Sequence, residues 1–180
     1  MAFRLYLWPL LLLGAPLCLS ALDPAFDEYQ IKAAFLYNFA KFVEWPAGTF
    51  ANAAEPIGIC IAGPNPFGSA LEEMVQGKKA GDRAFVVRRL ADPQNTDKCQ
   101  ILFIGAVEWK RIRATPGALP KRGVLTVGET DDFTTLGGII AFKLDGARVR
   151  FLIAAETADS AKLRISAKLL SLAEIVRKQP

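Results

Sequence analysis

Three short runs of apolar residues constrain the fold of this chain more than any other feature. They are IGICIA at Ile57–Ala62, ILFI at Ile101–Ile104 and VLTV at Val124–Val127. Apolar residues at nearly every position are typical of strands that are covered by helices on both faces. The intervening segments Phe67–Val75 and Val107–Ala114 are predicted helices. This β-α-β order favours a right-handed, doubly wound and mostly parallel sheet.

Further segments complete a single α/β domain at residues 22–180. We predict a strand at Phe85–Arg88 and amphipathic helices at Asp27–Val43 and Ser166–Arg177. The segments GGIIAFKL and ARVRFLI are joined across Asp145-Gly146, a strong hairpin signal. We expect this C-terminal hairpin to extend the sheet as an antiparallel edge. The predicted fold class is therefore a three-layer α/β sandwich with helices on both faces.

Residues 1–21 have the pattern of a cleaved signal peptide. Arg4 precedes the apolar run LYLWPLLLLGAPL, and Cys18-Leu19-Ser20 places small residues where a signal peptidase cuts. A transmembrane anchor is a weaker alternative, because a span needs about 20 apolar residues and this run is shorter and contains prolines. A lipoprotein signal ending at Cys18 is disfavoured by the large Leu17 before it. We therefore expect an exported, periplasmic protein.

Composition excludes several classes of function. The formal net charge is +4, and Lys and Arg occur in scattered pairs, which does not indicate nucleic-acid binding. The chain has no histidine, so Ser-His-Asp and Cys-His catalysis and the commonest zinc ligands are excluded. No serine lies in a G-x-S-x-G elbow. The sequence gives no reason to propose an enzyme, a cofactor or a metal.

Removal of the signal peptide leaves two cysteines, Cys60 and Cys99. An even pair in an oxidising compartment predicts a disulfide, and a pair of buried free thiols is the alternative. Both cysteines lie beside apolar strand-like runs, which would bring them close if the strands are neighbours. A bond closing a loop of about 40 residues stabilises a fold by ~4 kcal/mol in the chain-entropy model.

The loop GPNPFG after the first strand resembles a phosphate-binding loop. Its outer glycines, Gly63 and Gly68, have the G-x-x-x-x-G spacing, but the lysine of that motif is missing. Pro64 and Pro66 remove two backbone donors that a phosphate would use. Asn65 and Pro66 are typical of a helix start, so a structural turn is favoured. A weak ligand site at Gly63, Asn65, Phe67 and Gly68 remains the alternative.

Charged residues at two places raise further possibilities. Lys32 falls within the apolar face of the first helix, where it either extends to solvent or is a buried ammonium paired with a carboxylate or a ligand anion. Glu129, Asp131 and Asp132 could form a site for a divalent ion, although we favour a solvated acidic loop. Gly137-Gly138 before the next strand indicates a bulge or a close backbone approach.

Several motifs together resemble one known family. They are IKAAFLYNFAKFVEWP, ICIAGPNPFG, CQILFIG, VLTVGE, GGIIAF, RFLI and LRISAKLLSLA, in that order along the chain. They are similar to the YfiR family of exported bacterial proteins, from about Tyr29 to Val176. The resemblance implies an α/β fold and a disulfide between Cys60 and Cys99. The second cysteine pair of some members would lie near residues 134–141, which contain no cysteine here.

The resemblance also implies a function. The best-studied type represses a membrane-bound diguanylate cyclase by binding its periplasmic domain, which limits cyclic di-GMP and biofilm formation. An outer-membrane lipoprotein can sequester the repressor, members are dimers, and some bind GMP or tryptophan. We therefore expect a periplasmic regulatory binding protein, with a small-molecule sensor of nucleotides or amino acids as the alternative. Phe133, Leu136 and Ile139 are the candidate partner-binding residues, although core packing is the favoured role for at least one of them.

Overall fold

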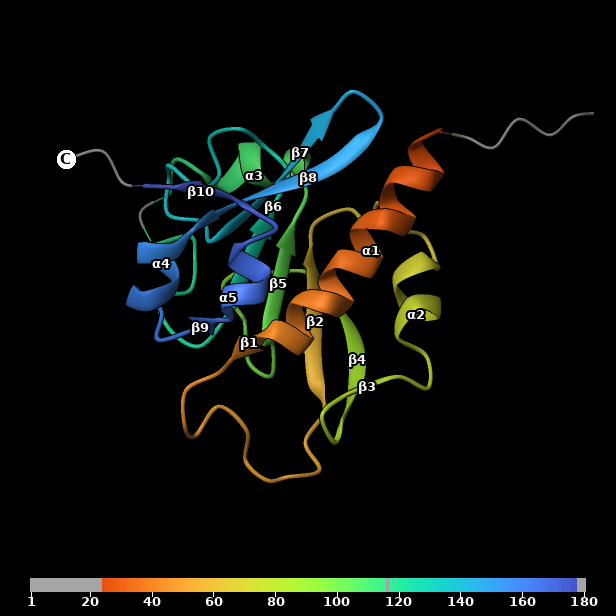
Figure 1. The fold of residues 1–180 in the computed structure, drawn as a ribbon, viewed down its shortest axis with the longest axis vertical. Coiled ribbons are helices and arrows are strands. Elements are labelled where there is room, and N and C mark those ends of the chain that lie inside the picture. The colour runs from red at the N-terminus through yellow and green to blue at the C-terminus, as the bar shows by residue number, and fades with distance from the viewer. Residues whose placement is uncertain (1–23, 116, 178–180) are drawn as a thin grey trace, which may run out of the picture.

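An eight-stranded sheet lies at the centre of the part of the chain that the structure describes, in the order β10-β8-β7-β6-β5-β2-β4-β3 (Figure 1). The structure is a computed structural model, and it describes residues 24–115 and 117–177. The predicted signal peptide at residues 1–21 lies outside this part.

The helices and strands alternate along most of the chain. Their bounds are α1 Pro24–Phe42, β1 Val43–Glu44, β2 Ile57–Ala62, α2 Ala70–Val75, β3 Lys79–Ala80, β4 Arg83–Leu90, β5 Ile101–Ile104, α3 Ala106–Ile112, β6 Leu125–Gly128, β7 Ile140–Asp145, β8 Arg148–Ala154, α4 Ala155–Ser160, β9 Arg164–Ile165, α5 Ala167–Leu170 and β10 Glu174–Val176. β1 and β9 form a separate antiparallel pair.

The sheet is doubly wound, as predicted. β4, β2, β5, β6 and β7 are parallel neighbours. The chain runs outward from β2 to β4 on one side, whereas it runs from β5 through β6 to β7 on the other. The strand order therefore reverses between β2 and β5, and such a switch point is the usual ligand-binding place of this architecture.

Helices cover both faces of the sheet, which confirms the predicted three-layer arrangement. α1, α2 and α5 lie on one face and α3 on the other (Figure 1). The first face has the larger core, in which Phe35 and Phe39 of α1 pack on Phe142 and Phe151 of the β7–β8 hairpin. The core of the second face is smaller and is built around Trp109.

The buried strands were the best-predicted elements. β2 and β5 have the predicted bounds, and every residue in them is buried. The disulfide is also confirmed, because Cys60 of β2 is bonded to Cys99 with the two Cα atoms 5.7 Å apart. It fixes the connection between β4 and β5 to the strand that this connection crosses.

Two predictions at the C-terminal end were wrong. The helix expected at Ser166–Arg177 ends at Leu170, and Glu174–Val176 forms β10 instead. β10 pairs in parallel with β8, so the β7–β8 hairpin lies inside the sheet and not at its edge. The free edge of β8 offers backbone hydrogen bonds to this segment, and pairing there overrides its helical pattern of apolar residues.

Candidate functional site

The four residues predicted to bind a ligand form a turn next to the switch point. Asn65 Oδ1 accepts a hydrogen bond from Phe67 N–H at 3.0 Å, and Asn65 Nδ2 donates to Gly68 O at 2.8 Å. α2 begins at Ala70, three residues after its predicted start, because Asn65 caps this turn and not the helix. The amide of Asn65 is thus occupied by the loop, and ligand binding by these residues and Gly63 stays a prediction.

A carboxylate lies against the first glycine of this loop. Gly63 has φ +78°, and a Cβ there would lie 2.7 Å from Cβ of Glu108. Glu108 is buried, and its carboxylate forms an ion pair of 2.5 Å with Arg111. Gly63 therefore allows α3 to pack closely against the loop. A negative charge at this place disfavours a phosphate group near Gly63.

Lys32 is buried, with 3% of its surface exposed, and its charge is paired. Its Nζ lies 2.5 Å from Glu28 Oε1, one helical turn earlier, and 2.6 Å from Glu129 Oε2. Nζ is also 4.4 Å from the centre of the Tyr29 ring, where a cation is attracted by the ring face. Lys32 thus does not extend to solvent, and both charges that balance it come from the protein.

Glu129 joins three elements at the carboxyl end of the sheet. It follows β6, binds Lys32 of α1, and accepts a hydrogen bond from Ala106 N–H at the start of α3 at 2.9 Å. Tyr29 O–H donates to Glu129 at 3.1 Å. Burial and the charge of Glu129 raise the pKa of Tyr29 above its ordinary value. Tyr29 therefore stays protonated and keeps donating its hydrogen bond to Glu129. Glu129 and its partners together hold α1 against the sheet.

The interpretation of residues 129–132 as a solvated acidic loop was wrong in part. The side chain of Glu129 is only 10% exposed, whereas Asp131 is exposed. Glu129 and Asp132 have different partners, so the three carboxylates do not converge. No group of three His, Cys, Asp or Glu residues that could hold a metal ion is found within residues 24–115 and 117–177.

Asp132 links the buried Trp109 to the exposed Arg113 at the surface of the α3 face. It accepts hydrogen bonds from Trp109 Nε1–H at 2.8 Å and from Thr130 Oγ1–H at 2.7 Å, and it pairs with Arg113 Nη1 at 2.6 Å. Burial acts to raise the pKa of Asp132, but the hydrogen bonds from Thr130, Trp109 and Arg113 outweigh it. The pKa therefore lies below its ordinary value.

The three predicted partner-binding residues have different surroundings. Phe133 is fully buried and Ile139 almost so, whereas Leu136 is 52% exposed. The Phe133 ring lies against two backbone positions, since a Cβ at Gly128 or Gly138 would come within 2.4 Å of it. This explains the glycine before β7 as a close backbone approach, as predicted. Only Leu136 of the three residues is placed to contact a partner.

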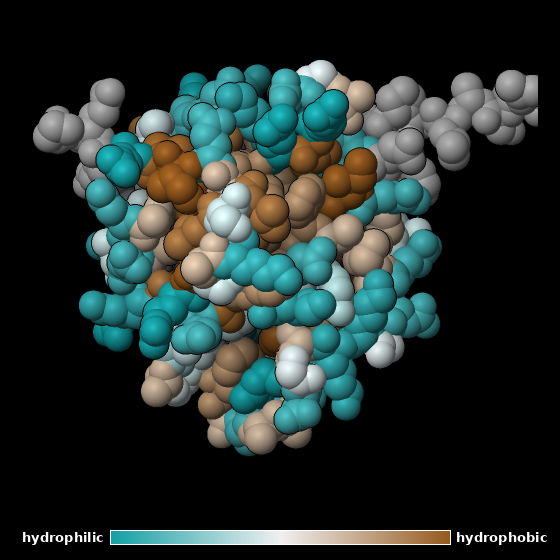
Figure 2. Space-filling model, viewed as in Figure 1, coloured by the Kyte–Doolittle hydropathy of each residue, from teal (hydrophilic) through white to brown (hydrophobic). Residues whose placement is uncertain are grey.

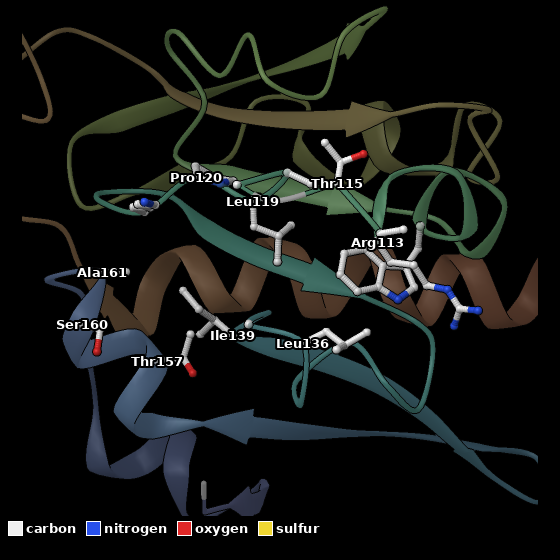
Figure 3. Close-up of a pocket in the computed structure, with 15 residues that line it drawn as sticks. Arg113, Thr115, Leu119, Pro120, Leu136, Ile139, Thr157, Ser160 and Ala161 are labelled. Carbon is white, nitrogen blue, oxygen red and sulfur yellow. The ribbon is translucent and has the colours of Figure 1, made fainter.

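A cavity of about 620 Å³ lies beside Leu136 and Ile139. Figure 3 shows Leu119 extending into it from the segment after α3, with Ile139 and Leu136 on the opposite side and Thr157 and Ser160 contributed from α4. Arg113 and Lys121 bring positive charge to its lining. Its volume lies within the range of small-molecule sites, and its lining is a mixture of apolar and polar residues.

Sequence reasoning identified Leu136 and Ile139 but missed the rest of this cavity. Trp109 forms part of its lining, and its only sequence signal is an aromatic residue in an amphipathic helix, which is equally typical of a core position. Residues from the segment after α3 and from α4 meet only because β7 and β8 place α4 beside that segment.

The part of the chain that the structure describes contains no helix long and apolar enough to span a membrane.

A family model with the description YfiR/HmsC-like (DUF4154) matches residues 29–174. The match covers α1 from Tyr29 onward, all strands from β1 to β9, the disulfide and the Lys32–Glu129 pair. The chain belongs to the YfiR/HmsC-like family. Membership agrees with the resemblance seen in the motifs, and it extends over almost all of the structure described above.

Two solved structures are similar to this chain at low sequence identity. One is a conserved domain protein from Vibrio cholerae O1 biovar El Tor, with a TM-score of 0.50, 11% identity and coverage of 83% of this chain and 60% of that one. The other is an ABC domain in complex with L-Trp from Streptococcus pneumoniae, with a TM-score of 0.45, 9% identity and coverage of 71% and 57%. The chain thus spans less than two thirds of either protein.

Proposed function

We propose that this protein is a periplasmic regulator that represses a membrane-bound diguanylate cyclase or a similar membrane sensor. The observation that carries the proposal is the family match over residues 29–174. Repression is stoichiometric and involves no catalysis: the protein docks on the periplasmic domain of its partner and binds the inactive state more tightly than the active state. The result is lower cyclic di-GMP and less biofilm.

An exposed apolar surface on the α1 face supports docking. We call it the α1-face strip and define it as Ile31, Leu144, Leu172 and Ile175, four large apolar side chains that are all exposed. Leu144 lies two residues after Phe142, which packs under α1, and Ile175 is in register with the buried Ile153. Figure 2 shows apolar residues gathered on this face over α1, the hairpin, α5 and β10. Exposed apolar surface of this kind is typical of a protein-binding site.

The strip replaces the surface predicted from sequence as the proposed docking site. Leu136 is the one exposed member of that earlier set, and it belongs to the α3 side of the sheet. The two surfaces therefore lie on opposite faces of the molecule. A partner that contacts one of them does not need the other, so single substitutions distinguish them.

Crosslinking in cells tests the proposal. The unaltered protein is expected to crosslink to an inner-membrane protein, and the products are identified by mass spectrometry. Leu144→Asp and Ile175→Asp should each reduce this product about ten-fold or more, because a buried charge at an apolar contact is costly. Leu136→Asp is the matched control and should leave the product unchanged.

Two results would count against the proposal. If no inner-membrane sensor or cyclase is recovered with the unaltered protein, the function is wrong. If Leu136→Asp abolishes the product while Leu144→Asp does not, the function stands but docking uses the α3 face. An outer-membrane lipoprotein recovered in the same experiment would identify a second partner, and recovery of a second copy of this chain would identify a homodimer.

The second candidate function is a periplasmic sensor of a nucleotide or an amino acid. The cavity of about 620 Å³ beside Leu119 and Ile139 favours it. Calorimetry with GMP and with tryptophan should then show saturable heat that Leu119→Arg removes, because Leu119 extends into the cavity and is only partly buried. Absence of heat and of a rise in melting temperature with both compounds would exclude these ligands.

A further inference from the structure

The connection between β4 and β5 crosses β2 at a glycine. β4 and β5 lie on opposite sides of β2, so residues 91–100 must pass over that strand. They do so at Gly58, where an added Cβ would lie 1.9 Å from the carbonyl oxygen of Lys98. Glycine thus allows the crossing segment to lie directly on the sheet, and the Cys60–Cys99 disulfide fixes it there.

Lys98 has an unusual backbone conformation at this crossing. Its φ is +61°, in the left-handed region that favours glycine. A lysine here is disfavoured for the backbone, and Lys98 is one of the residues that line a cavity of about 380 Å³. A costly backbone conformation at a residue that lines a cavity is an indication of function.

Arg88 of β4 lines the same cavity. It is in register with Cys60, and its Nη1 lies 2.9 Å from where a Cβ would stand on Gly58. Nη1 is buried, and none of the described residues accepts a hydrogen bond from it. Buried donors in proteins are almost always paired. Because Nη1 has almost no exposed surface, the guanidinium would have to turn toward the cavity to pair with an acceptor from outside the chain.

The remaining wall of the cavity is a fixed loop with limited negative charge. Arg83 Nη1 donates to Asn52 O at 2.9 Å and to Glu55 O at 2.7 Å, which holds residues 51–56 in place. Among the described residues, Glu55 is the one carboxylate that lines the cavity, and it accepts a hydrogen bond from Ala51 N–H. The described residues that line the cavity thus include two cationic residues and one carboxylate that is already hydrogen-bonded.

We propose that Arg88 and Lys98 bind a small oxyanion in this cavity. The planar guanidinium offers paired donors and the ammonium a compact charge, and together they fit the oxygens of a phosphate, sulfate or carboxylate group. The site lies beside the loop before β2, away from the predicted ligand loop after β2 and from the α1-face strip. It stands independently of the regulatory function.

Calorimetry on the purified chain with its disulfide intact tests the site. Inorganic phosphate, sulfate and acetate are titrated separately at one constant ionic strength, and at least one should give saturable one-to-one binding. Arg88→Met and Lys98→Gly should each weaken it about ten-fold or more, the loss expected for a charge-assisted hydrogen bond. Lys98→Gly also relaxes the backbone, so this variant should fold at least as stably as the unaltered protein.

Lys162→Gly is the matched control, because Lys162 is also a non-glycine residue with positive φ, at +63°, and does not line this cavity. It should bind the anion as tightly as the unaltered protein. The anion that gives saturable binding identifies the chemical group that the site recognises. The proposal is overturned if none of the three anions gives saturable heat, or if Lys98→Gly binds as tightly as Lys162→Gly.

Discussion

At the scale of single residues, Lys32 is the charge on which the position of α1 depends. Its ammonium group balances Glu28 and Glu129, and Glu129 in turn binds the first backbone N–H of α3. A helix, a strand end and a second helix are thereby joined through one buried cation. Loss of one partner would leave the other charges without compensation in a place that water hardly reaches.

Lys32→Met should lower the free energy of unfolding by about 3–5 kcal/mol, because it leaves Glu129 as an unpaired buried carboxylate. Urea unfolding followed by far-UV circular dichroism measures the change. The double variant Lys32→Met/Glu129→Gln should regain part of this loss, since no buried charge then lacks a partner. Equal stability of the single and double variants would show that the two residues are not coupled.

Asp132→Asn should be destabilising in a pH-dependent way. The folded-state pKa of Asp132 lies below its ordinary value, so its ionised form stabilises the fold above that ordinary value of about 3.9. This contribution is lost as the pH falls through the lower, folded-state pKa. The stability difference between the two proteins should be constant from about pH 5 to 8 and should shrink below about pH 4. A stability difference that grows as the pH falls would contradict this role of the Asp132 carboxylate.

For each of these contacts, the sequence drew attention to one residue but not to its pairing with the other. Lys32 stands out because it interrupts an apolar helix face, but its partner Glu129 is 97 residues away and follows a strand like any loop residue. Asp132 was identified only as one of three neighbouring carboxylates. Its partners Trp109 and Arg113 become visible only when α3 packs against the sheet. Side-chain pairs that tertiary packing creates leave no periodic signal in the sequence.

At the scale of helices and strands, the prediction was correct where the sequence pattern is compatible with only one kind of element. Ile57–Ala62 and Ile101–Ile104 are apolar on both faces, and both are central strands with the predicted bounds. The segment Ser166–Arg177 had a helical pattern, but its end pairs with β8. Residues 174–176 form a strand because the edge of β8 is available for pairing, and the sequence of this segment alone carries no sign of that edge.

Gly128→Ala tests how tightly one element end is packed. A Cβ on Gly128 would lie 2.4 Å from the Phe133 ring, so alanine should cost about 2–3 kcal/mol through overpacking. Gly105→Ala is the control at the end of the adjacent strand, where the nearest atom would be 3.5 Å away, and it should cost less than about 1 kcal/mol. Thermal or urea unfolding compares them. Equal losses for the two variants would contradict the packing described here.

At the scale of the whole molecule, three regions have separate roles. The α1-face strip is the proposed docking surface, the crossing of β2 by the β4–β5 connection holds the proposed oxyanion site, and the Lys32–Glu129 pair maintains the arrangement of α1 on the sheet. The family and the fold could be inferred from the order of the motifs. The docking surface could not, because exposure depends on how α1, the hairpin and β10 come together.

The cellular level of cyclic di-GMP tests the regulatory function most directly. Deletion of the gene should raise cyclic di-GMP and biofilm, because the cyclase is then no longer repressed. Expression of the unaltered protein or of Leu136→Asp should restore the low level, whereas a Leu144→Asp/Ile175→Asp protein that accumulates to the same amount should not. An unchanged cyclic di-GMP level in the deletion strain, measured by mass spectrometry, would contradict the proposed function.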